Sequence, residues 1–364
     1  MLKKLSILLL LSTFIFANEN TYSKEQIEKM IAKMVILGFR GESVSQSNTI
    51  HRNIKKYDLG GVILFDKDPT NKKRTKNIRS PYQLKKLTKQ LQAINKSKLL
   101  ISVDQEGGLV QRMRIENGFT FTPRASEVSK KGINFAKQTY KKLAISLNQN
   151  GINVDFAPVV DLAINSKNKV IVTRGRSFGK SSQEVVEYAS IFVEELKKEN
   201  VISVLKHFPG HGSSLSDSHK GFVDISNTWQ QKELKPYKQF IKNNTVDMIM
   251  TAHVYNKFLD PKYPATLSNN INTKLLRNIL GFKGVLISDD LQMRAISKHY
   301  SLEDTLTLAI NSGVNMLLFA NQLSRPVRLE KIIKIVSKQI KDNKIDLNKI
   351  IDSNKKINEM LNKY

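Results

Sequence analysis

Eight short apolar runs recur along the chain, and the intervals between them restrict the folds that it can adopt. The runs are 33–38, 59–65, 98–103, 152–157, 201–205, 246–251, 284–288 and 314–319. Most intervals hold a stretch with the apolar spacing of a helix, at 82–95, 132–149, 182–199, 232–242, 271–279 and 302–311. Strand and helix in alternation predict parallel strands with crossover helices. Eight such units predict a single (β/α)8 TIM-type barrel, although a doubly wound open sheet would show the same alternation.

The barrel interpretation makes a second prediction, because the active residues of such barrels lie just after the carboxyl ends of the strands. Titratable residues follow five of the predicted strands: Asp66, Asp104, Lys206 with His207, His253, and Asp289. Asp155 and Asp161 belong to the end of the fourth strand, on either side of Pro158, where loop capping is the simpler interpretation. We therefore expect an active site at the mouth where these strands end.

The region after the barrel and one long interval within it need separate interpretation. The interval 66–80 is polar and rich in lysine, asparagine and arginine, and is expected to be a surface loop. Residues 327–364 have helical spacing. We divide the chain into a signal peptide at 1–17, a barrel domain at 18–340, and a C-terminal extension at 341–364, a basic helix packed on the barrel.

The N-terminus has the pattern of a secretory leader. Two lysines, Lys3 and Lys4, precede an apolar run from Leu5 to Phe16, and Ala17 supplies a small residue at a cleavage position. The pattern predicts a periplasmic or secreted protein. The formal net charge is +27, spread along the chain, and this predicts weak, salt-sensitive contact with polyanions such as an anionic cell wall. No nucleic-acid partner is expected. There is no cysteine, so no disulfide is available.

The densest group of titratable residues follows the fifth run. The segment 206–219 reads KHFPGHGSSLSDSH and contains half of the six histidines. It is either a solvated loop or a catalytic one. In an extended segment Asp217 and His219 lie on the same side, and a carboxylate beside an imidazole suits a general acid/base near neutral pH. A metal site is a third interpretation, although the spacing is not a standard zinc pattern.

A pair of carboxylates follows the seventh run. Asp289 and Asp290 end the apolar strand 284–288, which would deliver a carboxylate to the mouth of a barrel. Such a carboxylate can act as a nucleophile, whereas helix capping is the simpler interpretation for Asp290.

Six motifs occur in the order typical of one family. They are GGVILF (60–65), DQEGGLVQR (104–112), RSFG (176–179), KHFPGHG with DSH (206–219), MTAHVY (250–255) and SDDLQM (288–293). The chain resembles the NagZ-type β-N-acetylglucosaminidases of glycoside hydrolase family 3 over roughly residues 25–325. The resemblance also implies the barrel. One departure is Gly175, which stands where the family has an aspartate before the arginine.

The resemblance assigns roles to matched positions. It implies that Asp289 is the nucleophile of a retaining mechanism and that His219, oriented by Asp217, is the acid/base. It implies sugar-binding roles for Asp104, Arg112, Arg176, Lys206 and His207. Without it, Arg112 and Arg176 could equally be partners in structural ion pairs. His253 also matches a family position, with a less clear role.

The resulting expectation is an exo-acting retaining β-N-acetylglucosaminidase, a monomer without cofactor or bound metal. It would remove non-reducing terminal GlcNAc from small saccharides of peptidoglycan or chitin type. Alternatives are another family 3 β-glycosidase or phosphorolytic variant, a metal-dependent hydrolase using the histidine-rich loop, and a wall-binding protein on an inactive barrel. The natural aglycone, the choice between water and phosphate as acceptor, and leader cleavage are left open by the sequence.

Overall fold

The computed structural model describes residues 22–94, 97–215, 223–322 and 326–364. The predicted leader at 1–17 lies outside the described residues, and so do Asp217 and His219 of the histidine-rich loop. Every other residue to which the sequence assigns a role is described. None of the described helices is both long enough and apolar enough to span a membrane.

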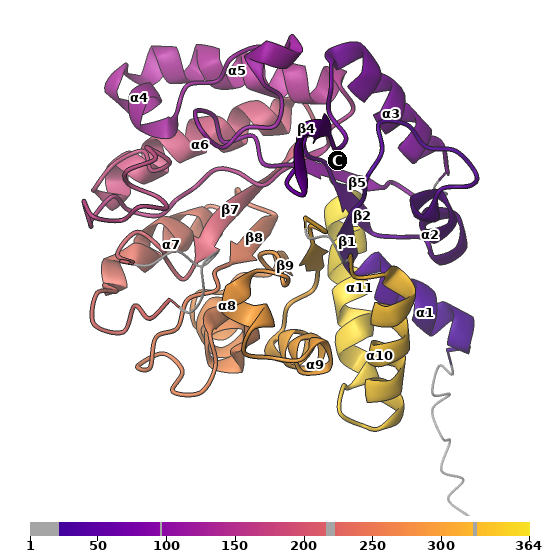
Figure 1. Cartoon of the computed structure of the whole chain (residues 1–364). Coiled ribbons are helices and arrows are strands. Elements are labelled where there is room, and N and C mark those ends of the chain that lie inside the picture. Colours follow the sequence, from indigo (N-terminus) through magenta and orange to yellow (C-terminus); the bar gives the residue numbers. More distant parts are fainter. Residues whose placement is uncertain (1–21, 95–96, 216–222, 323–325) are drawn as a thin grey trace, which may run out of the picture.

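Eight parallel strands form the centre of the fold (Figure 1). They are β1 (Val35–Gly38), β2 (Gly61–Ile63), β5 (Leu100–Val103), β6 (Val154–Asp155), β7 (Ile202–Phe208), β8 (Met248–Thr251), β9 (Val285–Ile287) and β10 (Leu317–Phe319). Their order is β10-β1-β2-β5-β6-β7-β8-β9, and a parallel bridge from Ile287 to Met316 joins the two edges. The sheet therefore closes almost completely, which confirms the predicted barrel and excludes the open sheet.

Helices cover the outside of the barrel (Figure 1). They are α1 (Lys24–Lys33), α2 (Thr49–Tyr57), α3 (Pro81–Ile94), α4 (Ala125–Lys130), α5 (Ile133–Gln149), α6 (Ser182–Lys198), α7 (Lys235–Lys242), α8 (Arg294–Ser297), α9 (Leu302–Ser312), α10 (Leu329–Lys341) and α11 (Leu347–Leu361). The stretch predicted at 271–279 is wound as a π-helix, Asn270–Ile279.

Helix α6 shows how the sequence sets these elements. Ser181 caps it by accepting a hydrogen bond from the backbone N–H of Glu184. Val185, Ala189, Phe192 and Leu196 recur at helical spacing and are fully buried toward the barrel. The strands are buried on both faces, as expected for parallel strands covered by helices.

The interval 66–80 is partly exposed, as its polarity predicted, but it is not a simple loop. It forms an antiparallel hairpin of β3 (Lys67–Asp68) and β4 (Asn71–Thr75), followed by buried Lys76, Asn77 and Ile78. The reason is that its polar groups find partners inside the protein. The ammonium of Lys76 donates to the carbonyl oxygens of Ala320 and Asn321, at 2.9 and 3.1 Å.

Helix α11 lies across the N-terminal end of the barrel. Asn354 donates to the carbonyl of Met30 in α1, and Lys363 pairs with Asp247, just before β8. The ammonium of Lys98, before β5, donates to the C-terminal residue Tyr364. The extension 341–364 is thus attached to the end of the barrel opposite the mouth, which leaves the carboxyl ends of the strands uncovered by it.

Candidate active site

Five charged side chains at the barrel mouth form one connected network. Lys206, near the end of β7, donates to Asp104 Oδ1 at 3.0 Å and pairs with Glu106 Oε1 at 2.7 Å. Arg176 forms a two-pronged pair with Glu106, its Nε and Nη2 each lying 2.7 Å from a carboxylate oxygen. Arg112 closes the other end, 3.3 Å from Asp104 Oδ2. Both arginines are therefore in ion pairs with loop carboxylates.

The network keeps its carboxylates ionised although they lie in a poorly hydrated place. Burial would raise the pKa of Glu106, but Arg176 and Lys206 outweigh it and hold that pKa at about 2. Burial would also raise the pKa of Asp104, but the positive charges of Lys206 and Arg112 keep it below its usual value. Lys206 is 2% exposed, and although burial favours its neutral form, Glu106 and Asp104 raise its pKa. The site therefore presents fixed charges near neutral pH.

His207 extends this network toward the loop after β7. Its Nδ1 lies 2.7 Å from Asp161 Oδ2, and its Nε2 lies 3.4 Å from Nη2 of Arg176. A carboxylate only accepts here and a guanidinium only donates. The two contacts therefore favour the neutral imidazole with its proton on Nδ1 and with Nε2 as an acceptor.

The first part of the histidine-rich loop is firmly anchored. Asp161 Oδ1 accepts from the backbone N–H of His211 at 2.8 Å, and Glu233 Oε2 accepts from that of Gly212 at 3.1 Å. Gly212 permits this packing, because a Cβ there would lie 1.9 Å from the carbonyl oxygen of Leu162. Asp161 thus caps the loop, as the sequence suggested, and also binds the imidazole of His207. Asp217 and His219 follow this anchored segment.

Asp289 comes directly after β9, on the same face of the barrel as the network. Its Oδ1 accepts from the backbone N–H of Asp290 at 2.7 Å. Asp290 does not cap a helix: its Oδ1 accepts from the N–H groups of Gln292 and Ala320, both at 3.1 Å, and so ties the ends of β9 and β10 together. Burial raises the pKa of Asp290 to about 6. His253 Nε2 donates to the carbonyl of Asp290 at 2.9 Å, so its clearest role is to hold this turn.

Asp155 lies at the end of β6, next to the network. It is fully buried; its Oδ1 accepts from the N–H of Gln105 at 2.9 Å, and its Oδ2 has no hydrogen-bond partner among the described residues. Burial raises its pKa to about 8, so the carboxyl is largely protonated at neutral pH. It therefore adds little negative charge beside Asp104 and Glu106.

The structure brings together the predicted sugar-binding residues, Asp104, Arg112, Arg176, Lys206 and His207, in one network. Sequence reasoning missed Glu106, which joins Arg176 to Lys206. A signal existed: Glu106 stands two residues after Asp104, the same spacing that suggested pairing Asp217 with His219. Among the described residues no group of three or more His, Asp or Glu side chains is placed to hold a metal ion.

Replacing Glu106 with glutamine is expected to lower the free energy of unfolding by about 3–5 kcal/mol at pH 7, because two buried cations lose their shared carboxylate. The usual pKa near 4.5 falls to about 2 in the fold, so this stabilisation is present above pH 4.5 and is lost as the pH falls toward 2. Urea unfolding at several pH values should show wild type and variant converging over that window.

Glu127→Gln is the matched control for this measurement. Glu127 also pairs with an arginine, Arg124, at 2.9 Å, but both side chains are exposed. Its replacement should cost only about 0–1 kcal/mol. A Glu106 variant as stable as the Glu127 variant would contradict a buried, ionised Glu106.

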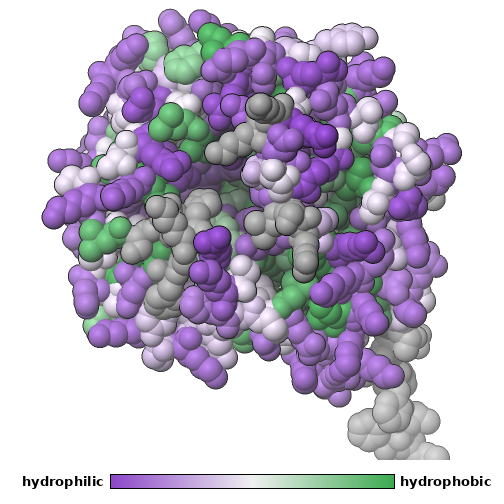
Figure 2. All heavy atoms as spheres, in the orientation of Figure 1, coloured by the Kyte–Doolittle hydropathy of each residue, from purple (hydrophilic) through white to green (hydrophobic). Residues whose placement is uncertain are grey.

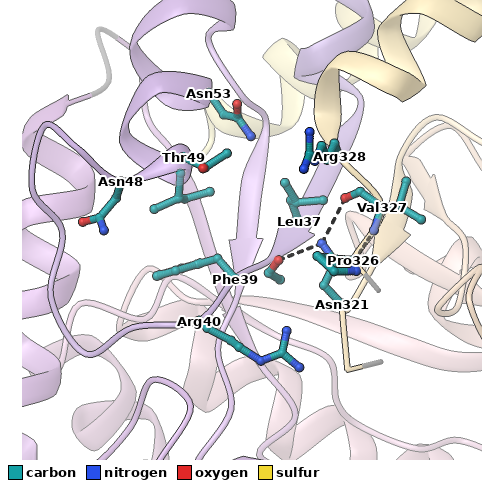
Figure 3. A pocket seen from close by; sticks show the side chains of 12 residues that line it. Leu37, Phe39, Arg40, Asn48, Thr49, Asn53, Asn321, Pro326, Val327 and Arg328 are labelled. Atoms are coloured by element: carbon teal, nitrogen blue, oxygen red, sulfur yellow. Dashed lines mark hydrogen bonds between the residues drawn. The ribbon is translucent and has the colours of Figure 1, made fainter. Parts of the chain in front are cut away.

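A cavity of about 400 Å³ opens elsewhere on the mouth face, between the N-terminal ends of α2 and α10 (Figure 3). Leu37 and Phe39 line it. Asn321 also lines it, and its side-chain amide donates to the carbonyls of Gly38 and Val327. None of the predicted site residues that the structure describes lines this cavity. Figure 2 shows mainly hydrophilic side chains around the mouth, with apolar ones within its hollows.

A closed (β/α)8 barrel with paired charges at the carboxyl ends of β5 and β7 defines a barrel enzyme with a strongly polar site. The model of the glycosyl hydrolase family 3 N terminal domain matches residues 24–360, and the chain belongs to this family. The family predicted from the six motifs is thus confirmed.

Individual relatives agree with this assignment. The chain is 32% identical to beta-hexosaminidase A of Pseudoalteromonas piscicida over 92% of its own length and 61% of that relative. It is 35% identical to a beta-hexosaminidase of Nitrosomonas eutropha, over 72% of this chain and 74% of that protein. Among solved structures, a glycoside hydrolase family 3 β-N-acetylglucosaminidase from Paenibacillus sp. superposes with a TM-score of 0.83 at 31% identity, covering 92% of this chain and 62% of that one. The chain thus spans about three fifths of the Pseudoalteromonas and Paenibacillus proteins.

Proposed function

We propose that the protein is a retaining β-N-acetylglucosaminidase that releases terminal GlcNAc from small saccharides. The observation that carries the proposal is the network of Asp104, Lys206, Glu106 and Arg176 at the mouth. A sugar ring offers hydroxyl and amide groups that both donate and accept. Ionised carboxylates and cations give such groups strong, directional hydrogen bonds.

Each member of the network has a distinct task in this proposal. Asp104 is the half-buried carboxylate and accepts from sugar hydroxyls, while Arg112 and Lys206 hold its two oxygens in place. Asp161 fixes the tautomer of His207, whose Nε2 faces the guanidinium of Arg176 and helps to position it. Glu106 is 6% exposed and touches the two cations, so it acts as their positioning residue.

The nucleophile in the proposal is Asp289. Its carboxylate attacks the anomeric carbon, the bond to the aglycone oxygen breaks, and a glycosyl-aspartate forms; water then attacks the same carbon and releases the sugar with retained configuration. The strand β9 and the hydrogen bond from the N–H of Asp290 fix the carboxylate at the mouth. A fixed nucleophile loses little entropy on reaching the reactive geometry.

His219, oriented by Asp217, is the acid/base of the proposal. Its imidazolium gives a proton to the departing aglycone oxygen, and its neutral form takes one from the attacking water. An imidazole titrates near neutral pH, which suits both steps. This assignment is supported by the sequence motif and by the anchored segment from Pro209 to Leu215, which directly precedes these residues in the chain.

The natural substrate is proposed to be a fragment of peptidoglycan or of chitin type. Hydrolysis of an aryl β-GlcNAc glycoside, with and without a chelator, tests the activity. We expect release of the aryl group that survives the chelator and gives β-GlcNAc as the first product. Activity lost with the chelator would favour a metal hydrolase, and no activity on any β-GlcNAc glycoside would favour a binding protein.

Export is the second part of the proposal and is supported only by the leader pattern at residues 1–17. A mature N-terminus near Asn18 in the periplasmic fraction would support it, and full-length protein in the cytoplasm would contradict it.

A further inference from the structure

The hairpin β3–β4 stands beside the sugar site. It leaves the barrel at Phe65 and Asp66 and returns at Lys76. The guanidinium of Arg112, which pairs with Asp104, lies over the ring of Phe65, 5.2 Å from its centroid. Lys76 Nζ lies 4.5 Å from the same centroid. Arg112 is therefore the side chain that separates Phe65, where the hairpin begins, from the carboxylate of Asp104. Figure 1 draws the hairpin at the mouth, with β2 and β5.

The hairpin is fixed to the barrel by its acidic residues. Asp66 Oδ2 lies 2.5 Å from Nε of Arg114, which belongs to the loop after β5. Asp68 binds Arg40, which follows β1, with 2.6 Å from Nε to Oδ2 and 3.3 Å from Nη2 to Oδ1. The Arg40 guanidinium lowers the pKa of Asp68 well below its usual range. A short two-stranded hairpin is marginal alone, and these pairs give it one position.

The hairpin also carries two exposed basic side chains, Lys67 and Arg74. Residues 66–76 contain five basic residues, at 67, 72, 73, 74 and 76, and two acidic ones, at 66 and 68. Both acids pair with arginines outside the hairpin, and Lys76 is buried against carbonyl oxygens. Lys67 and Arg74 are exposed, and no acidic group of the described residues lies within ion-pair distance of either. The hairpin therefore presents uncompensated positive charge next to the site.

We propose that the β3–β4 hairpin is the specificity element for an aglycone that carries carboxylate groups. The inference rests on the proposed glycosidase function and names the substrate class of that site. A guanidinium and an ammonium on a rigid support bind carboxylates without a large ordering cost. The network holds the terminal sugar, so the part of the substrate beyond the scissile bond is the part that reaches a neighbouring element of the mouth. A neutral aglycone gains nothing from Lys67 and Arg74.

Three disaccharide substrates with GlcNAc at the non-reducing end test the proposal. The second sugar is neutral GlcNAc, N-acetylmuramic acid with its free lactyl carboxylate, or N-acetylmuramic acid whose lactyl group carries a peptide with free carboxylates. The variant Lys67→Gln/Arg74→Gln removes two exposed charges. We expect its kcat/KM to stay within about twofold of wild type on the neutral substrate and to fall about three- to tenfold on an acidic one.

The arms of the test separate the sources of the carboxylate. A loss on the substrate with free muramic acid alone assigns the lactyl carboxylate, and a loss on the peptide-bearing substrate alone assigns the peptide carboxylates. A loss on both shows that a carboxylate at either place reaches the hairpin. The preference of wild type for acidic over neutral substrates should weaken as the salt concentration rises from about 0.05 to about 0.5 M, because the Debye length falls through about 8 Å in this range. The preference of the variant should barely change.

The matched control is Lys141→Gln/Lys142→Gln, which removes two exposed charges from the middle of α5 and should leave all three substrates unaffected. Equal losses on the neutral and acidic substrates, no loss on either, or the same loss in the control would overturn the role of the hairpin while the activity stands. A wild-type chain that cleaves none of the three would overturn the proposed function itself, and the role of the hairpin with it.

Discussion

Replacing Asp289 with alanine is expected to reduce kcat by roughly 10⁴-fold or more, the scale of losing an essential nucleophile. The carboxylate follows β9 at the mouth, where it accepts from the N–H of Asp290, and a single side chain at a barrel mouth carries little of the packing of the core. With an activated aryl glycoside and azide, the variant should regain turnover and release the α-glycosyl azide. A small anion then occupies the place of the missing carboxylate and attacks from the same side.

Asp290→Asn is the matched control for the nucleophile. The amide oxygen can still accept from the N–H groups of Gln292 and Ala320, so the turn between β9 and β10 should persist. Burial raises the pKa of Asp290 to about 6, so at lower pH the native group is already neutral and the variant resembles it. We expect kcat within about tenfold of wild type. If Asp290→Asn were inactive and Asp289→Ala active, the nucleophile assignment would be wrong.

The barrel could be predicted because its cause is local. Each strand is an apolar run such as 201–205 or 284–288. Each crossover helix has apolar residues at helical spacing on the face that packs against the barrel, as in α6. The hairpin at 67–75 could not be predicted in this way. Its polar sequence suggests solvent, and the groups that satisfy it, Arg40, Arg114 and the carbonyl of Ala320, are distant in the chain.

The site shows the same division between local and distant causes. Family motifs identified Asp104, Arg176 and Lys206, and the barrel explains why residues so far apart in the sequence meet. The sequence did not reveal that Glu106 pairs with two of them, Arg176 and Lys206, or that burial raises the pKa of Asp155. Both facts depend on how far each carboxylate lies from water and from cations on other strands. Such distances exist only in the closed barrel.

The largest effect expected in the histidine-rich loop depends on the leaving group. If His219 protonates the aglycone oxygen, His219→Ala should reduce kcat on a GlcNAc disaccharide by about 10²–10⁴-fold, the usual range for general acid/base help. A sugar alcohol needs that proton and a dinitrophenolate hardly does. With the dinitrophenyl glycoside the first step should therefore be nearly intact, and stopped-flow absorbance should show a burst as the glycosyl-enzyme accumulates.

Asp217→Ala serves as the comparison within the same loop. It should show the same dependence on the leaving group but a smaller loss, because the carboxylate orients and tunes the imidazole without transferring the proton to the substrate. The His219 variant should also lose the limb of the pH–rate profile that reports the acid/base, and the Asp217 variant should shift that limb, while the limb of the nucleophile remains in both. Equal losses of His219→Ala on the disaccharide and on the dinitrophenyl glycoside would mean that this histidine binds sugar or holds the loop, and the pairing of Asp217 with His219 as the acid/base would fall.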